Sequence, residues 1–274
     1  DAIQVEKEIE KDIAEDAEFE NDKLKIALEN AEKKLDETQK RSKETIKTYS
    51  KVYLSRGEKT LITLRREIGY LTKLKNEFIV DFKGFSVSDE NDDQLVWLVF
   101  EYVPSNLTDI VSYLSPMQKT QIAYKIAQAM EYLHSQQILH RDLKSSNVLI
   151  DSYYNPKITD FGFSRSDLNL PNMSRNIGTP NYMAPEVISS NRYGIAADVF
   201  SFGMLLYEIY TEKIPFDNLS PSRIEGKILK GVKLEFHSDC QKELVKLIKE
   251  CTNKEAKLRP SFEQILFRMR DNDI

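Results

Sequence analysis

Residues 140–147 read His140-Arg141-Asp142-Leu143-Lys144-Ser145-Ser146-Asn147, and the apolar run Val148-Leu149-Ile150 follows directly. Three shorter motifs come later in the chain, in the order Asp160-Phe161-Gly162, Gly178-Thr179 and Ala184-Pro185-Glu186. Any one short motif occurs by chance. Their occurrence together, in this order and at these separations, indicates one functional unit and decides how the rest of the chain is interpreted.

On these motifs the chain resembles the eukaryotic protein-kinase family. The resemblance covers residues 44–270 and is strongest from Pro104 onward. It implies an α+β, two-lobed fold, with a small β-containing N-lobe whose sheet is incomplete and a larger helical C-lobe. We expect a charged helical segment at 1–43, the N-lobe at 44–103 and the C-lobe at 104–274.

The first 43 residues differ in composition from the rest of the chain. They contain no Gly or Pro, and Glu, Lys, Asp and Ala dominate, which favours a helix. Leu24, Leu28, Ala31 and Leu35 have the spacing of a narrow coiled-coil seam, but they span less than two heptads. Two interpretations stay open, namely a helix that packs on the following domain and a helix that binds a partner or a second copy.

Hydrophobic spacing predicts the remaining elements. Strands are expected at 45–49, 78–80 and 95–100, and the polar run at 88–93 reads as a turn. Apolar residues recur with helical spacing at 59–76, 117–135, 198–211, 241–251 and 260–270. The pattern therefore predicts a partly β N-terminal piece and a mostly helical C-terminal piece, without internal repeats.

The resemblance implies phosphoryl transfer from ATP, a reaction that depends on alignment and charge neutralisation more than on a strong nucleophile. Asp142 would accept or orient the proton of the substrate hydroxyl, and Lys144 would lie beside the transferring phosphate. Asn147 and Asp160 would hold Mg²⁺, which prefers hard oxygen ligands. The implied cofactors are ATP and Mg²⁺.

The nucleotide contacts of the N-lobe are less regular. Glu67 matches the helix glutamate that pairs with the ATP-binding lysine. We favour Lys47 as that lysine, because it follows Thr45-Ile46 and precedes Glu67 by 20 residues, with Lys51 as the alternative. The hinge would comprise Glu101 and Val103, with Phe100 as a bulky gatekeeper and Leu149 as the floor beneath the adenine.

Lys144 also carries the specificity prediction. An Asp-Leu-Lys-x-x-Asn loop is typical of kinases that modify Ser or Thr, and the segment 178–186 resembles that of the tyrosine-kinase-like group of Ser/Thr kinases. Thr179 would then line the substrate-hydroxyl pocket. Phosphate on Ser166 or Ser174 would pair with Arg141 and order the activation segment. Asp198 matches a residue that ties a central helix to the catalytic loop, and Arg259 matches the partner of Glu186.

Composition excludes several other classes. A net charge of -5 argues against a nucleic-acid partner, and two cysteines are too few for a disulfide framework. No run of about 18 apolar residues indicates a membrane span, and no signal peptide is recognisable, so we expect a cytoplasmic protein whose partners are Ser/Thr-containing protein substrates.

One expected feature is missing. A kinase holds the ATP phosphates under a glycine-rich loop, yet the first glycine is Gly57 and no G-x-G-x-x-G occurs. Three interpretations stay open: an active Ser/Thr kinase with slow turnover, a kinase-like scaffold or pseudokinase, and a fragment that lacks the first two strands.

Overall fold

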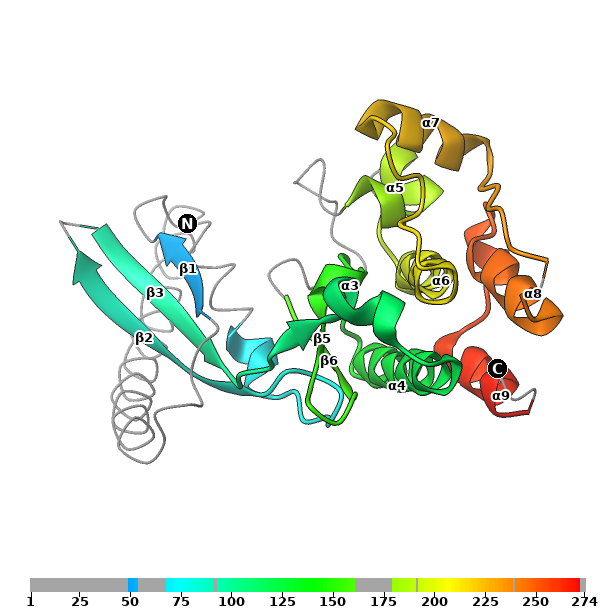
Figure 1. Cartoon of the computed structure of the whole chain (residues 1–274). Coiled ribbons are helices and arrows are strands. Elements are labelled where there is room, and N and C mark those ends of the chain that lie inside the picture. The colour runs from blue at the N-terminus through cyan, green and yellow to red at the C-terminus, as the bar shows by residue number, and fades with distance from the viewer. Residues whose placement is uncertain are drawn as a thin grey trace, which may run out of the picture. The chain divides into compact units, whose positions relative to one another are not determined.

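The computed structural model of the chain describes residues 49–53, 68–90, 93–160, 179–190, 192–238 and 240–271. The chain divides into two compact units (Figure 1). The first comprises Asp1–Thr72 and Asp81–Tyr102, and the second comprises Lys73–Val80 and Val103–Ile274. The predictions for residues 1–43, Lys47, Glu67, Ser166 and Ser174 lie outside the described residues.

The described part of the first unit is built on an antiparallel sheet. It contains β1 (Tyr49–Tyr53), β2 (Phe82–Glu90) and β3 (Asp93–Phe100), in the order β1-β3-β2. The central strand β3 is rich in β-branched and aromatic residues, which favour a pleated strand. The rings of Phe82 and Phe100 meet edge to face, with centroids 5.5 Å apart. The strand predicted at 95–100 is therefore confirmed.

Most of the polar run at 88–93, which its composition predicted as a turn, belongs to two antiparallel strands, β2 and β3, that end and begin within it. Ser88, Asp89 and Glu90 continue β2, and their partners on β3 are Leu95, Gln94 and Asp93. The hydrogen bonds of a β-ladder join backbone groups, so polar side chains do not prevent these residues from pairing. A connection between antiparallel strands needs as few as two residues, so most of the run can join the ladder.

A second correction concerns residues 78–80, which were predicted as a strand. They make only an isolated parallel bridge, in which Ile158 donates to the Phe78 carbonyl and Val80 donates to the Ile158 carbonyl, both at 2.9 Å. The bridge cannot extend along β6 (Pro156–Ile158), because Pro156, two residues earlier on the same edge, has no N–H to donate.

The second unit holds a small antiparallel sheet beside its helices. Its strands are β4 (Ser105–Asn106), β5 (Val148–Ile150) and β6, in the order β4-β5-β6. Val148 pairs with Ile158, and both are fully buried. This pairing brings the end of residues 140–147 beside the residues that precede Asp160.

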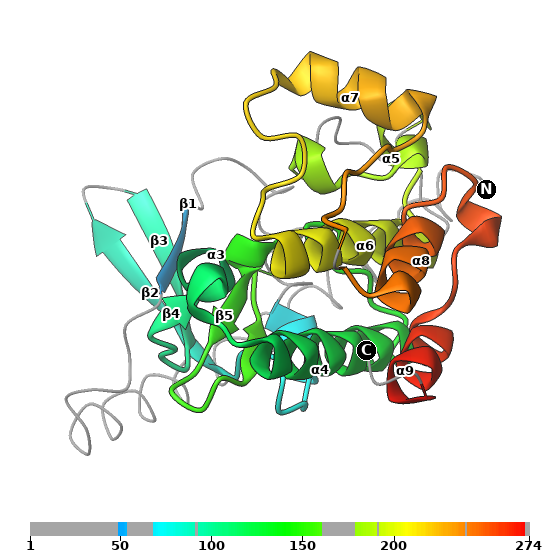
Figure 2. The ribbon, with the colours of Figure 1, turned by 45° about the vertical axis from the view of Figure 1, so that its right-hand side comes forward.

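Helices make up most of the second unit (Figures 1 and 2). They are α3 (Leu107–Ile110), α4 (Pro116–Ser135), α5 (Pro185–Ser190), α6 (Ile195–Thr211), α7 (Pro221–Lys230), α8 (Lys242–Cys251) and α9 (Phe262–Asp271). Single 3₁₀ turns lie at Val111–Tyr113, Ser145–Asn147, Pro180–Tyr182 and Ala256–Leu258. The helices predicted at 117–135, 198–211, 241–251 and 260–270 are confirmed to within a few residues, and so is the α+β fold.

Helix α4 begins where its sequence specifies. The Ser115 hydroxyl accepts from the Gln118 amide, and the Gln118 side chain accepts in return from the Ser115 amide. Pro116 occupies the first turn, where a missing N–H costs no helical hydrogen bond.

By contrast, the predicted helix at 59–76 is helical in its described part only as far as Leu71.

Helix α6 is the centre of the second unit. Every residue from Ala197 to Ile209 is buried, as expected for a helix that is apolar on almost all sides. Its Phe200 and Met204 join a core cluster with residues of α5, α7 and the 179–184 turn. Helices α4 and α8 pack on its other sides.

Gly203 sets how closely α8 approaches α6. A Cβ added at Gly203 would lie 2.6 Å from Cys251 Cβ and 2.8 Å from Thr252 Cγ2. Cys251 is fully buried, so the helix end has little room to move away. Only glycine permits this packing distance.

We therefore expect Gly203→Ala to destabilise the chain. Overpacking costs about 1–3 kcal/mol and exceeds the gain of about 1 kcal/mol in helix propensity. Gly226→Ala in α7 is the matched control, because nothing lies within 4 Å of its added Cβ; it should stabilise by about 0.5–1 kcal/mol. Urea unfolding followed by circular dichroism measures both, and equal shifts in the two variants would contradict the close approach at Gly203.

Candidate active site

The loop at 140–147 is anchored to α6 by one buried carboxylate. Asp198 is fully buried, and its Oδ2 and Oδ1 accept from the backbone amides of His140 and Arg141, each at 2.9 Å. His134 Nε2 of α4 lies 2.9 Å from Oδ2. The expectation that Asp198 ties a central helix to the loop is confirmed.

These contacts decide the ionisation of Asp198. Burial by itself would raise the pKa of this carboxyl, but the hydrogen bond and attraction of His134, the attraction of His140 and the Arg141 amide outweigh it. The pKa of Asp198 therefore lies below its ordinary value of 3.8. The charged form is the one that the loop binds.

The backbone between these amides and Asp142 is bent by an unusual residue. Arg141 has a positive φ of 74°, a conformation that most side chains avoid. The Tyr193 hydroxyl donates to the Arg141 carbonyl at 2.6 Å, and the Arg141 guanidinium lies over the Tyr193 ring, 4.9 Å from its centroid. These contacts hold the bend that presents Asp142.

Asp142 is the centre of a small polar cluster. Its Oδ1 accepts from the Thr179 amide at 3.0 Å and from the Thr179 hydroxyl at 3.2 Å. Its Oδ2 lies 2.7 Å from Lys144 Nζ and accepts from Asn147 Nδ2 at 3.0 Å. Lys144 Nζ also donates to the Thr179 hydroxyl at 2.8 Å. The structure thus brings together four residues that the sequence singled out, from segments about 35 residues apart.

Asn147 has its side chain oriented by its own donors. Nδ2 donates to both the backbone carbonyl and the carboxylate of Asp142. Both amide hydrogens are then used, so Oδ1 is the group left to face a ligand. The Thr159 amide donates to the Asn147 carbonyl at 3.0 Å, which places Asn147 beside the residue that precedes Asp160.

Asp160 has the features of an exposed ligand group. It is exposed and has a positive φ of 66°. No group of three or more His, Cys, Asp or Glu that could hold a metal occurs among the described residues. Mg²⁺ does not need one, because it commonly takes one or two protein oxygens together with water and substrate phosphates. Asn147 Oδ1 and the Asp160 carboxylate fit that donor set.

The turn that carries Thr179 is fixed by a second buried network. The Tyr182 hydroxyl donates to Glu208 Oε2 of α6 at 2.6 Å, and Ser145 Oγ lies 3.5 Å from the same hydroxyl. Thr108 donates to Ser145 Oγ at 2.8 Å. Burial raises the pKa of Glu208, although its hydrogen bonds to Tyr182 and Ser145 act in the opposite direction. Sequence reasoning assigned no role to Tyr182, which lies in the quoted segment 178–186, or to Glu208, which lies in the apolar segment of α6.

Glu186 is held as the sequence predicted. Arg259 NH1 and NH2 donate to Glu186 Oε1 and Oε2 at 2.7 and 2.8 Å, a two-bonded pair. The guanidinium also donates to the carbonyls of Ala196, Asn253 and Lys254 and lies over the Phe200 ring. This one side chain joins α5, α6 and the turn after α8.

The predicted nucleotide contacts are distributed over both units. In the first unit, Phe100 is buried at the end of β3. The Glu101 amide donates to the Asp81 carbonyl, and the Asp81 amide donates to Glu101 Oε1, both at 2.9 Å. In the second unit, Val103 is buried, and Leu149 is the half-buried residue of β5 between two buried neighbours. Lys51 lies in β1 opposite Trp97, and its side chain is outside the described part.

Comparison with known proteins agrees with this geometry. The protein kinase domain family matches residues 32–268 of the chain. The chain belongs to this family. The match begins at residue 32, before the proposed boundary at 43/44, and that boundary stays a prediction.

Relatives of this kinase domain carry consistent names. The chain is 36% identical over 228 residues, 81% of its length, to a putative serine/threonine-protein kinase/receptor of Acanthamoeba polyphaga mimivirus. The matched region is 14% of that relative. The chain is also 36% identical over 222 residues, 75% of its length, to a probable serine/threonine-protein kinase of Dictyostelium discoideum, of which it covers 50%. The chain thus spans half or less of the length of these relatives.

Among the described residues, no helix is both long and apolar enough to cross a membrane.

The low pKa of Asp198 predicts a pH-dependent contribution to stability. A carboxyl whose native pKa is lowered stabilises the fold fully above its ordinary pKa of 3.8, and this contribution is lost as the pH falls through the native value. We expect Asp198→Asn to lower the free energy of unfolding by about 3–5 kcal/mol between about pH 5 and pH 7, with the difference narrowing below about pH 4. Urea unfolding at a series of pH values measures this difference.

The exposed Asp217→Asn serves as the control and should change little at any pH. A difference for Asp198→Asn that stays constant down to about pH 2 would show that the charge of Asp198 is not what holds the loop.

Proposed function

We propose that this kinase domain transfers the γ-phosphate of ATP to Ser and Thr hydroxyls of protein substrates. The observation that carries the proposal is the cluster in which Asp142 is held by Lys144, Asn147 and Thr179. A carboxylate held in place by these contacts, with a cation at 2.7 Å, can accept a hydroxyl proton while positive charge stays beside the reacting oxygen.

The proposed roles follow from the contacts of each side chain. Asp142 Oδ1 already accepts from the Thr179 hydroxyl, so this oxygen is a ready acceptor for a substrate hydroxyl of the same kind. Lys144 donates to Thr179 and would move to a phosphate oxygen as a point charge. Asn147 and Asp160 would hold Mg²⁺, whose chemistry is to neutralise phosphate charge.

The nucleotide itself would lie against residues of both predicted lobes. Leu149 presents an apolar side chain that its neighbours in β5 leave half exposed, which suits the face of a flat ring. Backbone groups of Glu101 and Val103 would bind its edge, with Phe100 behind them. Lys47, paired with Glu67, would bind the phosphates; the position of Lys51 in the strand beside β3 supports Lys51 as the alternative.

Ser/Thr specificity is supported by the Lys144–Thr179 contact, because both residues belong to the motifs that resemble the tyrosine-kinase-like group of Ser/Thr kinases. The names of the relatives agree with Ser/Thr specificity. As further parts of the proposal, phosphate on Ser166 or Ser174 orders the activation segment, residues 1–43 bind a partner helix or a second copy, and the protein works in the cytoplasm without nucleic-acid partners.

A second candidate function is a kinase-like scaffold with little or no catalysis. It is favoured by one observation, the absence of a G-x-G-x-x-G motif. Loss of the backbone amides that such a loop supplies would reduce transition-state stabilisation without disturbing the Asp142 cluster.

Transfer of labelled phosphate from Mg-ATP tests the proposal. We expect the purified chain to label Ser or Thr in a protein substrate, as read by phosphoamino-acid analysis. Asp142→Asn should reduce the rate roughly a hundred- to ten-thousand-fold, because the proton acceptor is lost. Asp217→Asn keeps the same change in charge at an exposed position and should retain the rate. Absence of transfer by the folded chain, or labelling confined to Tyr, would contradict the proposal.

The same assay identifies the ATP-binding lysine. We expect Lys47→Met to reduce the rate about a hundredfold or more, since a charge on the phosphates is lost, and Lys51→Met to retain most of it. The reverse result would assign the role to Lys51. If neither variant loses activity while both stay folded by circular dichroism, the nucleotide is held by neither lysine and this assignment fails.

A further inference from the structure

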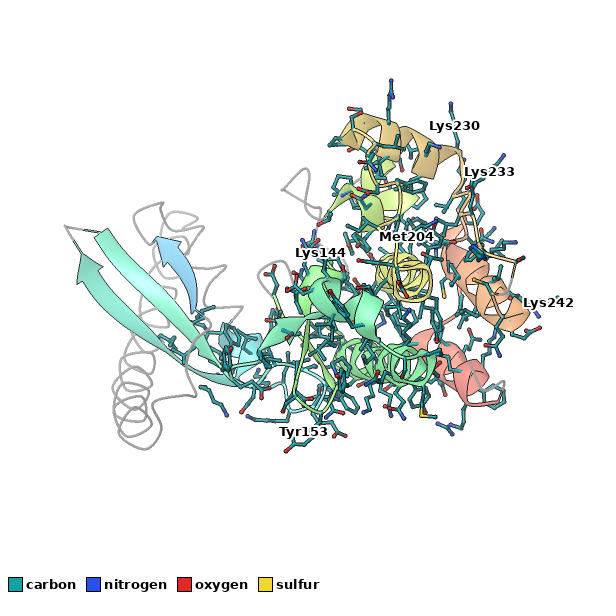
Figure 3. All side chains as sticks on the ribbon, in the orientation of Figure 1. Lys144, Tyr153, Met204, Lys230, Lys233 and Lys242 are labelled. Carbon is teal, nitrogen blue, oxygen red and sulfur yellow. The ribbon has the colours of Figure 1, made fainter. Side chains whose placement is uncertain are left out.

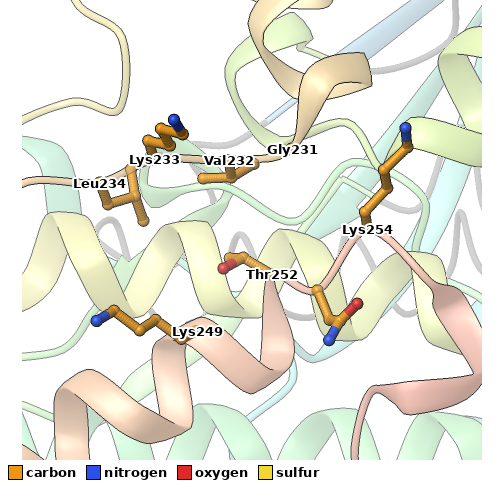
Figure 4. A pocket seen from close by; sticks show the side chains of 8 residues that line it. Gly231, Val232, Lys233, Leu234, Lys249, Thr252 and Lys254 are labelled. Atoms are coloured by element: carbon orange, nitrogen blue, oxygen red, sulfur yellow. The ribbon is translucent and has the colours of Figure 1, made fainter.

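A cavity of about 410 Å³ lies in the second unit, away from the Asp142 cluster in sequence and lining (Figure 4). One wall is the segment Gly231–Leu234, which follows α7, and the other is the end of α8 with the residues after it. Its lining includes Lys233, Lys249 and Lys254, together with Thr252 and Asn253. A volume of this order is that of a small-ligand site.

A neighbouring hollow extends the same basic surface along α8. It shares Lys249 and Asn253 with the first and adds Lys242, Val245, Lys246 and Glu250. Five lysines therefore line the two hollows, against one carboxylate, Glu250, which is paired with Arg268. Figure 3 shows Lys230, Lys233 and Lys242 extending outward from this part of the unit.

Most of this positive charge has no internal partner. Within the described ranges, Lys246 lies 3.8 Å from Glu243, and no ion pair joins the other four lining lysines to a carboxylate. The chain as a whole has a net charge of -5. A local excess of unpaired cations on an acidic protein creates a positive potential that attracts anions.

An alternative role for lysines at the C-terminal end of a helix is to neutralise the negative end of the helix dipole. At α8 other groups already serve that purpose. Arg259 donates to the carbonyls of Asn253 and Lys254, and the Thr252 amide and hydroxyl both donate to the Ile248 carbonyl. Lys249 and Lys254 are therefore not required to cap the helix.

The walls of the cavity are fixed by the core. Val232 and Leu234 pack against the cluster that contains Ile224 and Ile228 of α7, so the path of the segment is set. Asn253 Oδ1 accepts from the Glu255 amide at 2.9 Å, which leaves Nδ2 as a donor on the lining. Only the exposed lysine stems need to turn toward a ligand, and these are flexible.

We propose that the cavity bounded by Lys233, Lys249 and Lys254 binds the phosphate group of a phosphorylated Ser or Thr side chain on a protein. A phosphomonoester carries close to two negative charges and three acceptor oxygens, which match three ammonium groups and an amide donor. A recess suits a single projecting group. None of the exposed large hydrophobic side chains in the described ranges lines either hollow, so a membrane surface would find no apolar anchor here.

Phosphorylated Ser and Thr side chains are the products of the proposed function. This inference rests on the proposed function only for the origin of the phosphate group. A site of this kind would retain a phosphorylated substrate or a phosphorylated partner on the kinase domain. Binding is measured without ATP, so a failure here and a failure of phosphoryl transfer are told apart.

Fluorescence anisotropy with the full chain tests the site. The probe is a fluorescein-labelled phosphoserine pentapeptide with alanine at its other positions, and the control probe is the same peptide without phosphate. We expect binding of the phosphopeptide at least about tenfold tighter than of the control, and weakening as salt rises from about 0.05 M to about 0.3 M. The double variant Lys249→Gln, Lys254→Gln should weaken binding about tenfold or more.

The matched variant Lys73→Gln, Lys213→Gln removes the same charge from exposed positions outside the lining and should bind within about twofold of the unchanged chain. Equal binding of the two peptides, no binding, or equal affinities for the two double variants would overturn the proposal. Sedimentation with phosphatidylserine vesicles, but no peptide binding, would overturn it in favour of a membrane surface.

Discussion

The structure of the candidate site depends on one buried charge, the carboxylate of Asp198 on α6. It accepts from two consecutive backbone amides of the catalytic loop and lies against His134 of α4. A buried carboxylate without such donors would be strongly unfavourable, so the loop and the helix each satisfy a requirement of the other. The positive φ of Arg141 is tolerated because the backbone amides of His140 and Arg141 are both held by Asp198.

Helix α6 carries a second buried carboxylate, and the two have opposite electrostatic environments. Asp198 is surrounded by donors and histidines that lower its pKa, whereas burial raises the pKa of Glu208, whose partners are hydroxyl groups. The first holds the start of the loop as an anion. The second joins Tyr182 and Ser145, and so connects the middle of the loop to the turn that carries Thr179. One helix, buried from Ala197 to Ile209, thereby positions both halves of the Asp142 cluster.

The residues of this cluster could be predicted from sequence because their motifs resemble those of the protein-kinase family. Asp142, Lys144 and Asn147 lie within one short loop, so the resemblance of that single loop implied a role for all three. The pairs Asp198 with the loop and Glu186 with Arg259 were also predictable, since each joins two recognisable motifs. The contact between Tyr182 and Glu208 was missed because the two residues are 26 positions apart, and only the packing of α6 against the 180–182 turn shows that they meet.

The errors in the sheets share a physical cause, which also explains why the ATP-binding lysine stays a prediction. Strand formation depends on a partner that is distant in the chain. Residues 78–80 form a single bridge to Ile158, which lies about eighty residues later in the chain. The bridge does not become a strand pair because Pro156, two residues before Ile158 in β6, has no N–H to donate. In the same way, β1 runs from Tyr49 to Tyr53 because its partner is β3, with Lys51 opposite Trp97. Sequence spacing counts residues from Glu67 but contains no information on that register, so it cannot separate two lysines four positions apart. Register is decided by the sheet, and the chemistry of a strand-borne lysine depends on register.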